Sequence, residues 1–204
     1  MTKKYKVPII IITILLLVSV VLGLVYFMRD NEHEFVIKNK DIISKYNYSL
    51  KENDSSLKEE KFKELKNILK QDEIDDTEYA VVLAELFVVD VYDLDSKLNK
   101  YDIGGLEYIY ESDKDKFKSI MQDTLYNNIE DNTLNNRKQV LPKVINVTTN
   151  EVIQDEYKIN DLSFSCWKIK IKIDYKKDLG YDNYVLVTVI KDSEKLYVVE
   201  INPE

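Results

Sequence analysis

The chain contains one cysteine, one histidine, four glycines and three prolines in 204 residues. Because Cys166 is the only cysteine, no disulfide can form within the chain. Catalysis by a Ser/His or Cys/His pair requires an imidazole beside the nucleophile, and the only histidine is His33. Because His33 follows a long apolar run over residues 9–28, described below, we expect it to be an exposed residue beside a membrane. Lysines on the strand face of Cys166 could lower the pKa of its thiol, but a small side chain on a sheet surface is the preferred interpretation.

Motifs that bind metals or phosphates are also missing. The sequence has no C-x-x-C, no H-E-x-x-H and no Walker glycine loop. Its best carboxylate cluster is Asp90, Asp93 and Asp95, but D-V-Y-D-L-D-S-K lacks the register and the glycine of a calcium loop. Together with Glu85, these residues predict a solvated acidic stripe on a helix. We therefore predict no catalytic residue, no cofactor and no metal site.

One long stretch carries no charge at all: Ile9–Met28, IIIITILLLVSVVLGLVYFM. A helix of this length rises roughly 30 Å, the hydrocarbon thickness of a bilayer, so we predict a transmembrane helix over residues 9–28. A cleaved signal peptide is the alternative, but its apolar region is normally about 7–15 residues long and ends at small residues. The run here is longer and ends LVYFMR. Lysines precede the run and acids follow Arg29, so residues 1–8 are predicted to be a cytoplasmic tail.

The rest of the chain is acidic. The whole chain carries −8, and because the three lysines of residues 1–28 contribute +3, residues 29–204 carry −11. Such a field repels phosphate backbones and anionic head groups, and no basic stripe with interleaved aromatic residues is present. We therefore predict that this part of the chain does not bind nucleic acid.

After the apolar run we predict a stalk or linker over residues 29–56 and one extracytoplasmic domain over residues 57–204. Apolar side chains at helical spacing predict three helices in the domain, over about 57–71, 78–98 and 112–128. The first is expected to begin at a capping box of Ser56 and Glu59. The second is expected to be capped by Asp76 or Thr77, and it is apolar nearly all round, which is typical of a helix enclosed by its neighbours. Paired glycines then precede a short segment, Leu106–Tyr110, that is expected to be extended.

From Leu141 onward the apolar period changes to two, which predicts strands over 143–154, 164–175, 184–191 and 196–202. In the first strand Ile145, Val147 and Ile153 have the same parity and are expected on one face. The clearest strand, Phe164–Tyr175, alternates Trp167 and isoleucines with lysines, the pattern of a half-exposed antiparallel strand. Helices followed by an antiparallel sheet indicate the α+β class, with the helices packed on one face of a curved sheet.

The strands CWKIKIKIDY, YVLVTVI and LYVVEI, following three helices, resemble the cone-shaped NTF2-like fold over about residues 57–202. A cystatin-like sheet would have a similar pattern. With a short tail and one membrane helix, the chain is similar in architecture to the anchored NTF2-like scaffold subunits of bacterial conjugation and type IV secretion machines. The resemblance rests on no diagnostic motif, so it carries no functional residue over to this chain.

These observations predict a bacterial, non-enzymatic, single-pass protein of the cell membrane, with a cytoplasmic N-terminus and an extracellular C-terminal domain. Protein–protein interaction is the expected function, as a scaffold of a membrane complex, with membrane or cell-envelope proteins or a second copy as partners. Fifteen tyrosines offer amphipathic contact area for such an interface, although a tyrosine-rich core accounts for them equally well. The alternative function is a small-ligand or catalytic pocket. The resemblance to a cone-shaped fold implies a buried aspartate as base there, and Asp90 is the candidate.

Overall fold

The computed structural model describes residues 17–23, 38–159 and 161–203. The chain divides into two compact units, Met1–Val36 and Ile37–Glu204. The predicted tail 1–8, most of the predicted membrane helix 9–28 and His33 lie outside the described residues, and the described part of that run, 17–23, is helical. Within the described residues, no helix has both the length and the apolar character that crossing a bilayer requires.

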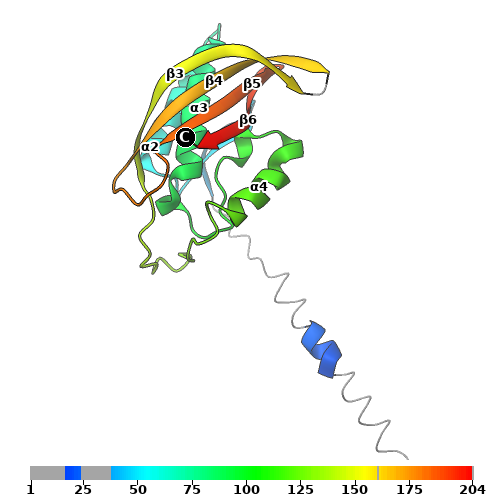
Figure 1. Ribbon diagram of the computed structural model, residues 1–204, viewed down its shortest axis with the longest axis vertical. Coiled ribbons are helices and arrows are strands. Elements are labelled where there is room, and N and C mark those ends of the chain that lie inside the picture. The colour runs from blue at the N-terminus through cyan, green and yellow to red at the C-terminus, as the bar shows by residue number, and fades with distance from the viewer. Residues whose placement is uncertain (1–16, 24–37, 160, 204) are drawn as a thin grey trace, which may run out of the picture. The chain divides into compact units, whose positions relative to one another are not determined.

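The unit Ile37–Glu204 is α+β, as the sequence predicts, with its two long helices before a four-stranded antiparallel sheet (Figure 1). Helix α2 (Ser56–Ile68) buries Phe62, Leu65 and Ile68, which confirms the predicted amphipathic face. Its N-cap is Ser55, whose hydroxyl oxygen accepts a hydrogen bond from the Lys58 amide at 3.3 Å. The cap predicted at Ser56 was therefore one residue too late.

Helix α3 (Asp76–Tyr92) is the centre of the unit. From Tyr79 to Tyr92 every residue except Val81 is buried, which confirms the prediction of an enclosed helix. The carboxylate of Asp75, rather than of Asp76, caps it by accepting from two amides, those of Thr77 and Glu78. The helix ends before the predicted residue 98 because a 3-10 turn, η1 (Leu94–Ser96), follows it.

The sheet is a meander in the order β3-β4-β5-β6, with bounds Val144–Ile159, Leu162–Tyr175, Tyr184–Asp192 and Lys195–Pro203. Trp167, Ile169, Ile171 and Ile173 of β4 are all buried on the face that packs against α3, while Lys168, Lys170 and Lys172 point to the other face. The predicted alternation of this strand is therefore confirmed. Figure 1 shows the sheet curving over the helices.

In β3 the predicted alternation is wrong. Val147 is buried, but Ile145 and Ile153 are 53% and 48% exposed. The register against β4 shifts between Val144 and Asn146 and again between Thr149 and Glu151. Each extra residue of a bulge moves the following side chains to the opposite face, so residues of equal parity do not share one face across it.

The predicted stalk contains part of the folded unit. β1 (Asn39–Ile43) and β2 (Tyr48–Lys51) form an antiparallel hairpin, and Tyr46, Tyr48 and Leu50 are buried in the main core. The Tyr48 hydroxyl contacts the Tyr79 hydroxyl of α3 at 2.6 Å and donates to the Leu196 carbonyl oxygen at 3.2 Å. A stalk over residues 39–51 is therefore wrong, because these side chains complete the core between α3 and β6.

Short turns precede the third helix. η2 (Leu106–Tyr108) occupies the segment expected to be extended, because Gly105 adopts a left-handed φ of 81° and its carbonyl accepts from the Tyr108 amide at 3.1 Å. η3 (Glu111–Asp113) then leads into α4 (Lys114–Asp123), which is shorter than the predicted helix. Segments on both sides of α4 in the sequence contribute to a second, smaller cluster of buried side chains: Leu94, Ile103, Tyr126, Ile129 and Leu141.

Replacing Tyr48 by alanine tests whether the hairpin belongs to the fold. Because Tyr48 is 0% exposed, Tyr48→Ala should lower the free energy of unfolding of the unit by about 3–5 kcal/mol. Ile42→Ala, in the same hairpin but half exposed, should cost less than about 1 kcal/mol. Urea unfolding of the full chain in detergent, followed by the fluorescence of the single tryptophan, measures both. Equal small effects would show that residues 39–51 are a linker.

Candidate functional site

The candidate base from the sequence, Asp90, lies in a buried ionic cluster made by four segments. Its Oδ1 atom is 2.9 Å from Nζ of Lys58 on α2 and 2.8 Å from Nζ of Lys97 beyond η1. Its Oδ2 atom accepts from the Gly105 amide at 2.8 Å. Lys58 also contacts Oδ1 of Asp54 at 3.0 Å. The side chains of all four charged residues are 7% exposed or less.

The charges of this cluster determine its protonation. Burial by itself raises the pKa of Asp90, but the charges of Lys58 and Lys97, with the hydrogen bonds from Lys97 and Gly105, hold the pKa well below its ordinary value. Burial is the largest single effect on the pKa of Lys97 and lowers it. The charge of Asp90, smaller contributions from Tyr126 and Asp102, and the hydrogen bond to Asp90 together raise the pKa above its ordinary value. Asp90 is therefore ionised and paired, and it is not poised to take up a proton near neutral pH.

The paired glycines have a specific role at this cluster. A Cβ atom on Gly104 would lie 1.9 Å from the backbone oxygen of Asp90, and one on Gly105 would lie 2.7 Å from the Phe87 ring. The Tyr126 hydroxyl fixes the same segment, because it accepts from the Gly104 amide at 3.2 Å and donates to the Val91 carbonyl oxygen at 2.8 Å. From the sequence, the paired glycines predict only an interruption of the helical pattern of apolar residues. Their direct approach to α3 carries no sequence signal beyond the pair itself.

Two other carboxyl groups are buried without full pairing. Glu107 accepts at Oε2 from the amide and hydroxyl of Ser49, both at 2.8 Å, while its Oε1 atom and the Tyr108 hydroxyl are buried without a hydrogen-bond partner among the described residues. Asp93 accepts from the Val144 amide at 3.3 Å, and its Oδ2 atom is likewise unpartnered. Burial raises the pKa of Glu107 and of Asp93 above their ordinary values. Both are costly to keep ionised.

The predicted acidic stripe is not solvated. Glu85, Asp90 and Asp93 are 7%, 6% and 2% exposed, and only Asp95 keeps a half-exposed side chain. Glu85 is 2.9 Å from Nζ of Lys61 and accepts from the Thr149 hydroxyl. These three acids are buried because each of them meets a partner from another element. The described residues contain no group of three or more His, Cys, Asp or Glu side chains placed to hold a metal ion.

Cys166 differs from expectation, whereas the tyrosines favour one of the two roles predicted for them. Cys166 is 1% exposed rather than a surface residue, and burial raises the pKa of its thiol, opposite to the lowering that neighbouring lysines could cause. Several tyrosines form the core rather than a surface: Tyr46, Tyr48, Tyr79, Tyr92, Tyr108 and Tyr126 are buried. The tyrosine content therefore supports a core more than an interface.

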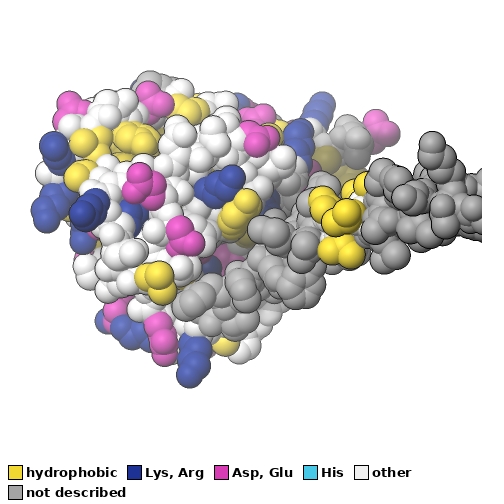
Figure 2. Space-filling model, turned by 90° about the horizontal axis from the view of Figure 1, so that it is seen from below, with side chains coloured by type: hydrophobic (Ala, Val, Ile, Leu, Met, Phe, Trp, Pro, Cys, Tyr) yellow, Lys and Arg dark blue, Asp and Glu magenta, His cyan; other side chains and the backbone are white. Residues whose placement is uncertain are grey.

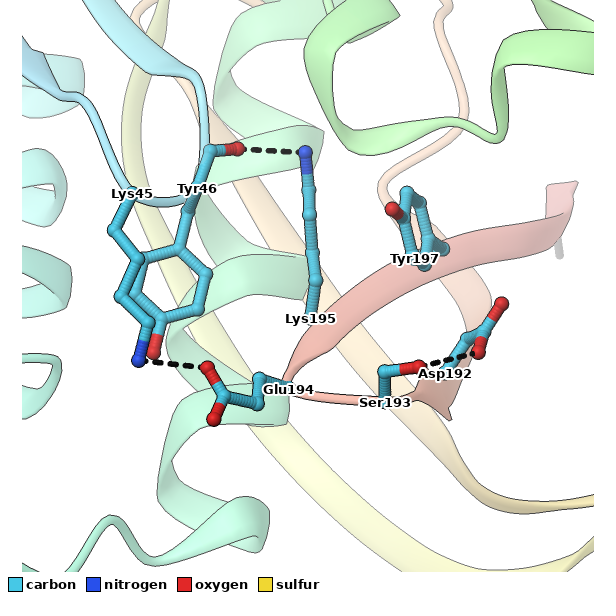
Figure 3. Close-up of a pocket in the computed structure, with 7 residues that line it drawn as sticks. All are labelled: Lys45, Tyr46, Asp192, Ser193, Glu194, Lys195 and Tyr197. Atoms are coloured by element: carbon cyan, nitrogen blue, oxygen red, sulfur yellow. Dashed lines mark hydrogen bonds and ion pairs between the residues drawn. The ribbon is translucent and has the colours of Figure 1, made fainter.

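A shallow surface depression of about 400 Å³ lies between the β1–β2 turn and the β5–β6 turn (Figure 3). Its polar groups are engaged with one another. Lys195 donates to the Tyr46 carbonyl oxygen at 2.7 Å, Lys45 pairs with Glu194 at 2.7 Å, and the Ser193 hydroxyl contacts Asp192 at 3.1 Å. Because these bonds close on themselves, they leave few donors or acceptors for a ligand.

Figure 2 presents one face of the folded unit with its side chains coloured by type. Acidic and basic side chains are interspersed there, and the exposed apolar side chains of the folded unit form small separate groups.

The two edges of the sheet are treated differently. At the β6 edge, Ile109 forms a parallel bridge with Val198, the Tyr110 ring stacks on Tyr197 at 4.2 Å, and the Tyr110 hydroxyl donates to Asp192 at 2.7 Å. At the opposite edge, β3 is 16 residues long and pairs, within the described residues, only with β4. Most of its side chains are exposed. A covered edge and an open edge therefore flank one sheet.

Comparison with protein-family models, with curated proteins and with solved structures found no match to this chain. The NTF2-like and cystatin-like resemblances thus remain predictions, and the site must be judged from its own geometry.

Removing the central charge of the buried cluster tests its structural role. Asp90→Asn leaves Lys58 and Lys97 buried without their common counter-ion and should lower the free energy of unfolding by about 3–5 kcal/mol. Asp95→Asn, which removes a half-exposed carboxylate 3.8 Å from Lys143, should cost less than about 1 kcal/mol. Because the Asp90 pKa lies below its ordinary value, the difference between wild type and Asp90→Asn should persist down to about pH 4. Urea unfolding at about pH 7 and at about pH 4 measures this difference in stability. An Asp90→Asn variant as stable as Asp95→Asn would contradict the structural role of Asp90.

The pH dependence of stability expected from Glu107 is opposite to that expected from Asp90. Its pKa is raised in the folded state, so its contribution to stability is present below the ordinary value of 4.5 and is lost as pH rises through the folded pKa. Glu107→Gln removes this titration. The stability of the variant minus that of the wild type should therefore increase between about pH 4 and about pH 7. Parallel urea titrations measure this difference, and a difference that stays constant with pH would contradict it.

Proposed function

We propose that the chain is a non-enzymatic, single-pass membrane protein whose unit Ile37–Glu204 binds other membrane or cell-envelope proteins outside the cytoplasm. The observation that carries this proposal is the open edge of β3, a 16-residue strand that pairs on one side only among the residues that the structure describes. An open edge presents a row of backbone donors and acceptors that another strand can pair with. We further propose an NTF2-like or cystatin-like arrangement, which the order of helices and sheet supports.

The membrane anchor rests on the run of residues 9–28 and on the exposure of its described part. Leu17, Val18, Val20, Val21 and Leu22 are between 49% and 63% exposed. Consecutive exposed aliphatic side chains on a helix are costly in water and favourable in a bilayer. The lysines before the run and the acids after it support an N-terminus in the cytoplasm.

Enzymatic or ligand-binding function is the weaker candidate on the present geometry. Asp90 is fixed by two lysines, and the depression at Lys195 satisfies its polar groups internally. Both observations support interaction over a pocket on the same fold.

A photoreactive residue at the open edge tests the proposed function. The full chain would carry a benzophenone amino acid at Asn150, an exposed β3 position, or at Lys118, an exposed position on α4, as the matched control. In cells that make the chain naturally, illumination should give a protein adduct from position 150 and little from position 118. The chain and its adduct should sediment with membranes, resist alkaline extraction and require detergent for release. A chain released without detergent would overturn the anchor, and equal adducts from both positions would overturn the edge as the binding surface.

A further inference from the structure

Nine residues of the β3 edge form a regular template for another strand. From Glu151 to Ile159 every residue of β3 pairs with the next residue of β4 in turn, ending at Leu162, without a register shift. Both bulges of β3 lie before this stretch. Bulges are one of the features that hinder pairing at a sheet edge, together with charged side chains, and residues 151–159 have charged side chains but no bulge.

The geometry of the β3–β4 hairpin determines which backbone amides of β3 face the open edge. Two residues of the sequence separate Ile159 from Leu162, and the pair that flanks such a loop is a hydrogen-bonded one. Hydrogen-bonded and non-bonded pairs alternate, so the amides of Val152, Gln154, Glu156 and Lys158 face away from β4. The Glu156 amide donates to its neighbour Asp155 at 2.8 Å, which agrees with this direction.

The side chains beside these amides have a simple pattern. On the face opposite α3, β3 presents Glu151, Ile153 and Asp155 in succession, opposite Lys170, Lys168 and Cys166 of β4. All three β3 residues are exposed, Ile153 by 48%, and Asp155 already pairs with Lys168 of β4 at 2.6 Å. Each acid thus has a β4 lysine on one side and the open edge on the other. A strand added at the open edge would place its own side chains about 4.5–5.5 Å from them. The complement of acid–apolar–acid is cation–apolar–cation.

We infer that the open edge of β3 binds an extended segment of a partner protein that carries Lys or Arg at its first and fifth positions and a β-branched residue at its third. The segment pairs antiparallel to residues 151–155, as every other strand of this sheet does. Its cations lie opposite Glu151 and Asp155, and its apolar residue packs on Ile153. This inference rests on the proposed function and specifies the chemistry of the partner.

A second copy of this chain fits the edge less well. Antiparallel pairing of two β3 strands about Ile153 would set Glu151 of each copy against Asp155 of the other. Like charges directly opposite each other are destabilising in a sheet. Lys158 is the only cationic side chain in β3. In the register about Ile153, the acids of β3 therefore favour a cationic partner over a second copy.

Peptide binding to the full chain in detergent tests the inference. The probe is TKTVTKT, labelled with a fluorophore, and its controls are TETVTET and the register-shifted KTTVTTK, which keeps composition but moves both lysines to the other face. TKTVTKT should bind about tenfold more tightly than either control. Hydrogen exchange should slow at the amides of Val152, Gln154 and Glu156, which face the probe, and not at the amide of Lys158 beyond its end. Equal binding of all three peptides would overturn the inferred partner chemistry.

Two variants at one position locate the site. Gln154→Pro removes an outward amide, whereas Gln154→Ala removes the same side chain and keeps the amide, so only the proline variant should lose about tenfold in TKTVTKT affinity. Equal affinity of both variants would overturn the edge as the peptide site. Self-association that the proline variant abolishes would assign the edge to a second copy and overturn the cationic partner. Adducts at position 150 without TKTVTKT binding would retain the interaction function and reject only this partner chemistry.

Discussion

The ionised carboxylate of Asp90 determines where the segments of the folded unit meet. Removing a carboxylate from water costs several kcal/mol, and only close cations and hydrogen bonds offset that cost. Lys58 brings α2 to α3, Lys97 fixes the chain beyond η1, and the Gly105 amide fixes the segment before η2. Apolar side chains alone could pack α2 on α3 in more than one register. A buried charge with two required partners admits far fewer arrangements, so we expect its main effect to be on specificity rather than on net stability.

The glycine pair and Tyr126 follow from this arrangement. For its amide to reach Asp90, the backbone at Gly105 must pass so close to α3 that a side chain at Gly104 or Gly105 would collide with it. Tyr126 then bonds to the amide of Gly104 and to the last turn of α3. The small cluster of Leu94, Ile103 and Tyr126 packs around the same point. One ionic group thus orders the region between α3 and α4, which has little regular structure of its own.

The spacing of apolar residues correctly predicted features that depend on neighbouring residues in the sequence. It failed for features that depend on partners distant in the sequence. The alternation of β4 and the enclosed character of α3 were readable because each strand or helix face is set by adjacent residues. The burial of Glu85, Asp90 and Asp93 was not, because nothing within α3 shows that Lys61, Lys58 and Val144 will meet them. The bulges of β3 reversed the expected faces of Ile145 and Ile153 for the same reason. The β1–β2 hairpin had a readable signal, the alternating Tyr46, Tyr48 and Leu50, which a mixed charged segment obscured.

The asymmetry of the sheet connects this core to the proposed function. The chain covers the β6 edge with Ile109 and Tyr110, from the segment that the Asp90 cluster fixes in place. No described segment does the same for β3, and its last nine residues run without a bulge. A short strand added to such an edge buries little apolar area, so pairing in free solution would be weak. The proposed membrane anchor would confine the unit to two dimensions and raise the effective concentration of a neighbouring partner, so that a weak and charge-selected contact would be sufficient.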